Sequence, residues 1–200
     1  MEIRRLDRTA VLETVRLVQQ ANPGDWDLPT PCASWTLRDL MAHMVGQHYG
    51  FAAAASGGGD DLAAWQPGVL GDDPATTYRA AAWTAIDAFA RQDSFTREFA
   101  LPEISTTTRF PATIAIGFHF LDHVIHGWDL ARTLGIPLDL DDEVTDAALT
   151  FALRVPDDAR RLVPEPLFRP ALPAAPGASS LDLALAALGR SPDWSAATLQ

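Results

Sequence analysis

The segment HFLDHVIHGWDL, residues 119–130, contains three of the five histidines of this 200-residue chain, together with two aspartates. At about 100° per residue, a helix would gather its ionisable side chains on one face: His119, Asp122, His123 and His126, with Asp129 just beyond. The other positions are mostly apolar, and ionisable groups buried on so apolar a helix need partners. A single histidine in such a place is most often a hydrogen-bonded core or surface residue, but four groups on one face favour a divalent metal ion.

Asp122 and His126 form the tightest pair of this segment. They are four residues apart, roughly 6 Å along a helix axis, which is a spacing at which two side chains can chelate one ion. At least one further ligand must come from another element, and His43 is the best candidate because it lies in the middle of an apolar helical pattern. Facing helices of a bundle pack roughly 8–10 Å apart, so these three side chains could meet around one ion. Two nitrogens and one oxygen suit zinc, nickel or another first-row divalent metal.

The helical periodicity of the chain predicts a mainly α protein. Helices are expected at about 6–21, 36–55, 75–92, 111–134, 142–154 and 180–188. Thr36 and Asp39 have the spacing of a capping box, and Gly135 is placed to end the long helix that carries the histidines. Residues 95–109 are expected to be extended, as in a small hairpin. We predict one helical bundle domain, residues 1–155, and an irregular appendage, residues 156–200, packed on it.

Composition narrows the possible partners. The net charge is −11, with 15 basic residues, all of them arginine, and no basic cluster, which argues against nucleic acid or an anionic membrane as the partner. The absence of lysine removes Schiff-base catalysis. No apolar run is long enough to span a bilayer and no signal peptide is recognised, so we expect a cytoplasmic protein. The sole cysteine, Cys32, agrees with a reducing compartment.

Two half-motifs carry a family resemblance. The segment PTPCASWTLRDLMAH, residues 29–43, is followed about eighty residues later by Asp122-x-x-x-His126-Gly-Trp-Asp129-Leu. Together they resemble the metal-binding domain of mycothiol-dependent maleylpyruvate isomerase. More broadly they are similar to the DinB-like four-helix-bundle superfamily, in particular its uncharacterised actinobacterial metal-binding branch. The resemblance spans about residues 5–135, and the tail 189–194 is also similar to that branch.

The resemblance implies a DinB-like four-helix bundle with a small irregular α/β appendage at its C-terminus. It also implies that His43, Asp122 and His126 bind a divalent metal, usually zinc. The family more often has glutamate at the acidic position, and an aspartate is one methylene shorter. His119 and His123 therefore remain as alternative ligands.

The family's chemistry supplies a functional hypothesis. In the isomerase the metal is thought to lower the pKa of the mycothiol sulfur, so that the thiolate attacks an electrophile. The resemblance thus implies a metal- and mycothiol-dependent transferase or isomerase with a small-molecule thiol or electrophile as its partner. The alternative is a non-catalytic, metal-dependent binding or stress-related protein of the same fold. The substrate, the native metal and the presence of a homodimer are left open.

Several other side chains have predicted roles near the site. Asp129 could orient the imidazole of His126 or serve a structural contact, and Gln47 could contact metal-bound water. Arg190 could bind a carboxylate substrate if the appendage covers the bundle.

Three aromatic or imidazole residues are expected elsewhere. Trp35 and Trp128 are expected to pack in the core. His48 lies about 500° around the helix from His43, so we expect it to point away from the site and to be solvated.

Overall fold

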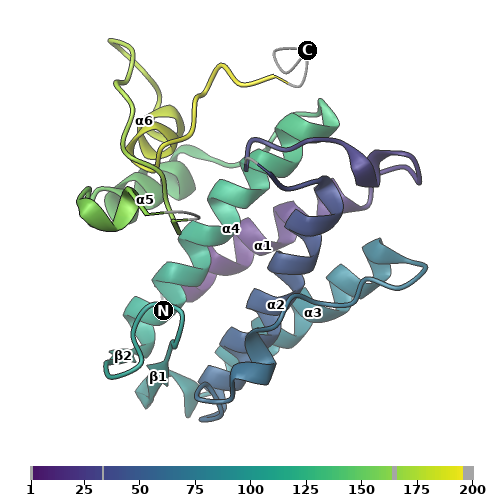
Figure 1. Ribbon diagram of the computed structural model, residues 1–200. Coiled ribbons are helices and arrows are strands. Elements are labelled where there is room, and N and C mark those ends of the chain that lie inside the picture. Colours follow the sequence, from purple (N-terminus) through teal and green to yellow (C-terminus); the bar gives the residue numbers. More distant parts are fainter. Residues whose placement is uncertain (1, 33, 164–165, 196–200) are drawn as a thin grey trace. The chain divides into compact units, whose positions relative to one another are not determined.

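The computed structural model describes residues 2–32, 34–163 and 166–195. The chain divides into two compact units, residues 1–138 and 139–200. The first unit contains four long helices: α1 (Glu2–Val18), α2 (Leu37–Ala55), α3 (Pro74–Ala90) and α4 (Ala112–Leu134). α1 packs on α3 and α4, and α2 also packs on α3 and α4, so the four form a closed bundle (Figure 1). The predicted mainly α fold is confirmed.

Local signals account for where these helices begin and end. The Thr36 side chain accepts a hydrogen bond from the backbone N–H of Asp39, and the Asp39 carboxylate accepts one from the backbone N–H of Thr36. This is the predicted capping box, at the start of α2. α3 begins with Pro74 after the N-cap Asp73, and α4 ends at Gly135, whose φ of 66° is left-handed. The predicted helix ends are therefore confirmed to within a few residues.

Short elements connect the helices. The predicted hairpin consists of β1 (Glu98–Ala100) and β2 (Arg109–Pro111), which pair antiparallel with Phe99 opposite Phe110. Three single-turn 3-10 helices lie in the loops: η1 (Asp25–Asp27), η2 (Leu62–Trp65) and η3 (Ser94–Thr96). The Phe99 ring is fully buried, so the hairpin contributes to the core at that end of the bundle.

The core of the bundle is apolar except for a set of buried ionisable and polar side chains. Valine, leucine, methionine and alanine side chains of the four helices form most of one part of the core, and phenylalanine side chains from α2, α3 and β1 contribute to another. Among them lie Asp7, Gln47, His48, His119, His123, His126 and Asp129, all buried. Buried ionisable groups of this kind need partners, so the region around these residues is where we look for a functional site.

The second unit contains α5 (Asp142–Ala152), the 3-10 turn η4 (Ala159–Arg161) and α6 (Ser180–Ala187). α5 packs on α6, so the compact units divide before α5; the domain boundary at residues 155 and 156 stays a prediction. The described parts of the segment 156–177, residues 156–163 and 166–177, are irregular apart from η4, as expected, and no strand occurs in residues 139–163 and 166–195. Arg161 is buried and donates to the backbone carbonyls of Val155, Pro156, Arg169 and Ala187. One guanidinium therefore organises much of this unit.

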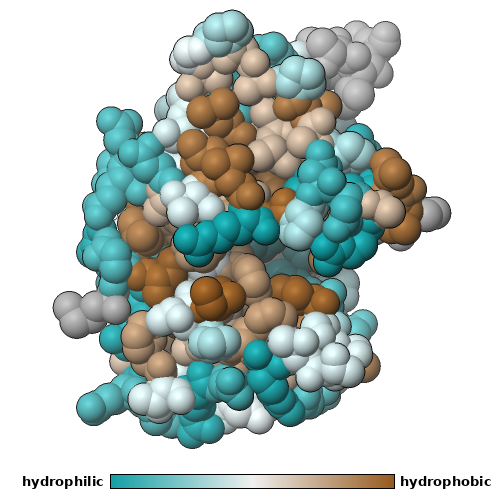
Figure 2. All heavy atoms as spheres, turned by 90° about the vertical axis from the view of Figure 1, so that its left-hand side faces the viewer, coloured by the Kyte–Doolittle hydropathy of each residue, from teal (hydrophilic) through white to brown (hydrophobic). Residues whose placement is uncertain are grey.

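The surface is mixed in character. Large exposed apolar side chains of the second unit are Leu153, Leu162, Val163, Leu167 and Leu172, and Figure 2 shows apolar patches between hydrophilic ones on the face it presents. Among the helices of the described residues, none combines the length and apolar composition that crossing a bilayer requires. The cytoplasmic location stays a prediction.

Candidate metal centre

α2 and α4 bring His43, Asp122 and His126 together, and we call this trio the outer site. Asp122 Oδ1 lies 3.3 Å from His126 Nε2 and 3.9 Å from His43 Nε2. One ligand atom from each of the three residues lies within 4.8 Å of the others. The side chains of His43 and Asp122 are 25% and 23% exposed. A small molecule can therefore approach the trio from solvent.

Asp129 fixes the ring of His126. Its Oδ2 lies 2.9 Å from His126 Nδ1, and the aspartate is fully buried. The proton on Nδ1 is shared with this carboxylate, which directs Nε2 toward Asp122. The same hydrogen bond orients many metal-binding histidines.

Carboxylates dominate the electrostatics of the outer site. Burial disfavours the charged form of Asp122, but the imidazoles of His126 and His43 outweigh it and hold the pKa of that carboxyl well below its usual range. Burial also disfavours an imidazolium at His126, but Asp122 and Asp129 raise the pKa of this ring to about 9. In the metal-free site His126 is therefore a charged imidazolium at neutral pH. The site stabilises a positive charge at this position.

Trp35 lies against both histidines of the outer site. Its ring centroid is 4.9 Å from that of His43 and 6.1 Å from that of His126. The tryptophan is only partly buried, whereas Trp128 lies in the core as expected. The sequence favours core packing over a substrate contact for Trp35, and the ring packs against the core as well as beside the site. Its position immediately before the capping box of the helix that carries His43 was the signal for a place beside the site.

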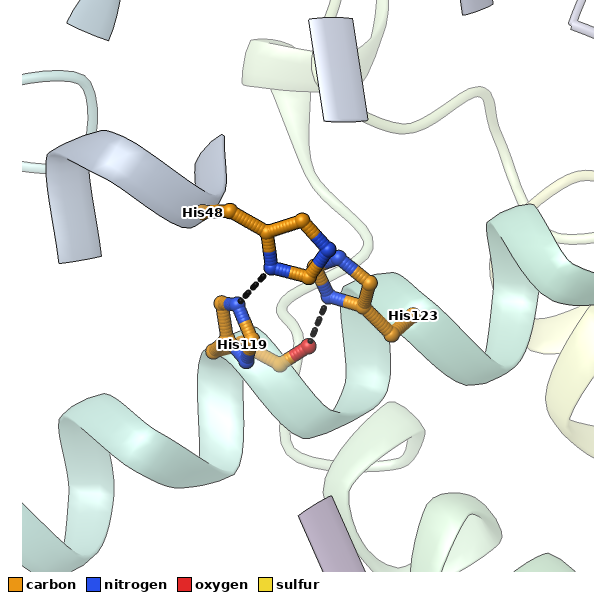
Figure 3. A group of neighbouring side chains, drawn as sticks. All are labelled: His48, His119 and His123. Carbon is orange, nitrogen blue, oxygen red and sulfur yellow. Dashed lines mark hydrogen bonds between the residues drawn. The ribbon is translucent and has the colours of Figure 1, made fainter. Parts of the chain in front are cut away.

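His119 and His123 lie in a different cluster. Together with His48 they form what we call the inner cluster (Figure 3). All three residues are 0% exposed. His123 directly follows Asp122 of the outer site in the sequence, and its Nδ1 lies 3.9 Å from Asp122 Oδ2. As alternative ligands beside His43, these two histidines stay a prediction.

His48 is not solvated, and that expectation was wrong. Its position on α2 does turn it away from His43, but the face it occupies packs inside the bundle. Its ring lies 5.1 Å from that of Tyr78 on α3 and 4.3 Å from that of His123 on α4. An angle relative to one residue could not reveal which helices cover that face.

Two further predicted residues have other observed contacts. Gln47 is buried and donates a hydrogen bond of 2.8 Å to Oε2 of Glu103, a loop residue that the sequence did not single out. Arg190 belongs to the second unit, where its backbone N–H donates to the carbonyl of Leu185. The roles of Gln47 at metal-bound water and of Arg190 at a carboxylate stay predictions.

The fold and the site define the class to which this chain belongs: a mainly helical bundle with a trio of potential metal ligands between two of its helices. Residues 8–131 match the family described as the mycothiol maleylpyruvate isomerase N-terminal domain. The match covers more than half of the chain, and the chain belongs to this family.

Relatives and solved structures agree with that assignment. Two uncharacterized proteins of Mycobacterium tuberculosis, from strains CDC 1551 and H37Rv, are 31% identical over 129 residues. The match covers 62% of this chain and 63% of each relative, less than two thirds of the relatives' length. The crystal structure of the mycothiol-dependent maleylpyruvate isomerase has a TM-score of 0.65 at 16% identity, and that of a mutant 0.66 at 14%. Both comparisons cover 96% of this chain and 90% of the other. At such identities they show the fold, and the DinB-like prediction is confirmed.

Proposed function

We propose that the outer site binds a divalent metal, with zinc the best match, and that the protein is a thiol-dependent transferase or isomerase with mycothiol as its cosubstrate. The single observation that carries this proposal is the convergence of His43, Asp122 and His126 from two helices on one point. Family membership supports the choice of thiol, because the isomerase of known structure is named for its dependence on mycothiol.

The residues of the outer site fit such an ion. Two atoms bound tetrahedrally to zinc at about 2.0–2.2 Å lie roughly 3.3–3.6 Å apart, and the Asp122 contacts of 3.3 and 3.9 Å are close to that range. Asp122 Oδ2 is buried and has no hydrogen-bond partner within the described residues. A cation would satisfy that oxygen. The aspartate, although shorter than the family's usual glutamate, reaches both histidines.

Each residue then has a task. A divalent ion supplies a Lewis acid that lowers the pKa of a coordinated thiol. His43, Asp122 and His126 would hold the ion, and the partial exposure of His43 would leave room for a small molecule. The hydrogen bond from His126 to Asp129 fixes the ring and its tautomer. Trp35 offers an apolar wall beside both imidazoles, against which the thiol or the electrophile can pack.

Elemental analysis of purified protein tests the metal assignment. We expect His126→Ala to bind one ion fewer per chain than the parent, because it removes one of the three proposed ligands. Asp60→Asn is the matched control, since Asp60 is an exposed carboxylate paired with Arg109. Equal metal content in the parent and His126→Ala, with both folded, would refute the assignment of the ligands.

The second step of the test addresses catalysis. We expect the metal-loaded protein, and not the chelator-treated one, to consume mycothiol in the presence of some member of a panel of small electrophiles. Trp35→Leu should raise KM several-fold without changing the metal content. No thiol consumption across the panel by fully loaded protein would favour the alternative, a metal-dependent binding or stress-related protein.

A further inference from the structure

The inner cluster is a second group of potential metal ligands, separate from the outer site. His48 comes from α2, and His119 and His123 from α4; all three are fully buried. His48 Nδ1 lies 3.1 Å from His119 Nε2, and Figure 3 shows the hydrogen bond between the two rings. The ring centroids of His119 and His123 are 4.1 Å apart, and those of His48 and His123 are 4.3 Å apart. Three imidazoles therefore share one small volume in the interior.

Hydrogen bonds fix two of these rings from behind. His119 Nδ1 lies 2.6 Å from Asp7 Oδ1, which reaches the cluster from α1. His123 Nδ1 lies 2.8 Å from the backbone carbonyl of His119, to which it donates. On both rings Nδ1 is engaged, which leaves Nε2 to serve the cluster. A histidine held through Nδ1 by a carboxylate or a carbonyl has the support that metal-binding histidines commonly have.

The cluster is not satisfied by the protein itself. His48 Nε2 and His123 Nε2 are buried without a hydrogen-bond partner in the part of the chain that the structure describes. Such groups are rare, because an unpaired buried polar atom costs free energy. A metal ion would give both nitrogens the partner that the described protein groups do not supply.

We propose that His48, His119 and His123 form a second site for a divalent cation of the zinc type, which links α2 to α4. One nitrogen from each ring lies within 4.8 Å of the others, and the 3.1 Å contact is close to the edge of a tetrahedral zinc site, roughly 3.3 Å. His119 and His123 bind through Nε2, and His48 offers Nδ1 or its unpartnered Nε2. Asp7 supports the ligand His119 and ties α1 to the same ion.

The burial of the inner cluster determines the role of such an ion. No ring is open to solvent, so a thiol or an electrophile cannot reach an ion there. The ion would enter while the chain folds and would stabilise the bundle. This proposal does not depend on the function of the outer site, and its failure would leave that function untouched.

The test uses the full chain with the outer site removed. In His43→Ala/His126→Ala protein, any ion that remains belongs to the inner cluster. The protein is unfolded, stripped of metal and refolded with or without zinc. We expect one zinc per chain after dialysis and a higher Tm for the zinc-refolded sample. Absorption spectroscopy at the zinc edge should show ligation dominated by imidazole.

Adding His48→Gln provides the matched comparison. We expect this triple variant to retain no zinc and to show no change of Tm with zinc. If it does not fold, Asp7→Asn in the double variant keeps all three imidazoles and should bind zinc about 10–100-fold more weakly, because it weakens the support of His119. The proposal would be overturned if the folded double variant held no zinc. It would also be overturned if the folded triple variant retained zinc.

Discussion

The outer site and the inner cluster are built alike and differ in their surroundings. Each takes one histidine from α2 and two ionisable side chains from α4. His43 and Asp122 of the outer site are about one quarter exposed, whereas the inner rings are 0% exposed. Exposure, and not ligand type alone, therefore separates a site that reactants can reach from one that they cannot.

The outer site and the inner cluster also differ in the charge of their histidines. Asp122 and Asp129 raise the pKa of His126 to about 9, whereas burial among other imidazoles lowers that of His48 well below its usual range. A metal at the outer site must therefore displace a proton at neutral pH. At the inner cluster the lowered pKa of His48 leaves that ring neutral, so a metal there displaces no such proton from it.

Removing the carboxylate that supports the inner cluster should have the largest effect. We expect Asp7→Ala to lower the free energy of unfolding of the metal-free protein by about 3 kcal/mol, because it leaves His119 buried without its partner. Urea denaturation measures the change. Asp60→Ala, which breaks an exposed ion pair, should cost less than about 1 kcal/mol. Equal losses in the two variants would show that the inner hydrogen bond is unimportant.

The pH dependence of metal binding should distinguish the two sites. The folded pKa of His126 is raised above its ordinary 6.5 to about 9, so zinc competes with a proton below that value. We expect the affinity of the outer site to rise roughly tenfold per unit between about pH 7 and pH 9, and then to level off. Titrations with a competing chelator measure this. An affinity that is flat over the same range would contradict the raised pKa.

The raised pKa of His126 also predicts how the free energy of unfolding of the metal-free protein depends on pH. Because the folded pKa of His126 is raised, it contributes stability that is fully present below pH 6.5 and is lost as the pH rises through about 9. Denaturation of metal-free parent and His126→Ala protein at several pH values should show this difference. The same slope in both would locate the effect at another residue.

Asp129→Asn should weaken the outer site selectively. The variant keeps the shape of the side chain but removes the charge that orients His126. We expect zinc affinity at the outer site to fall about 10–100-fold, with the inner cluster unaffected. A fall at both sites would mean that the substitution disturbs α4 as a whole.

The smallest effect is expected at the start of α2. Asp39→Ala removes half of the capping box and should lower the free energy of unfolding by about 1 kcal/mol. His43 lies about one turn after Asp39, and His48 lies more than two turns after it. Hydrogen exchange should therefore increase at His43 more than at His48. The reverse order would contradict the view that the outer site depends on this cap.

Much of the fold was predictable because its signals are local. The capping box at Thr36, the left-handed Gly135 and the hairpin around Phe99 each follow from a few neighbouring residues. The meeting of Asp122 with His126 is equally local, since both lie on one helix. His43 was placed beside them by the resemblance and by the geometry of helix packing.

The features that the sequence did not predict depend on contacts between distant segments. In the inner cluster, His48 of α2 meets His119 of α4, and Asp7 of α1 contacts His119 from a third helix. No spacing within one helix reveals that arrangement. Likewise, the contact between Gln47 and Glu103 joins α2 to a loop 56 residues away. Side-chain direction can be read from a helical pattern, but the partner on the facing element cannot.

The most direct test of the outer site is anomalous scattering at the zinc edge from crystals of zinc-loaded protein. The account predicts a peak about 2.0–2.2 Å from His43 Nε2, His126 Nε2 and an oxygen of Asp122. A zinc-loaded crystal without anomalous density between these three side chains would contradict it.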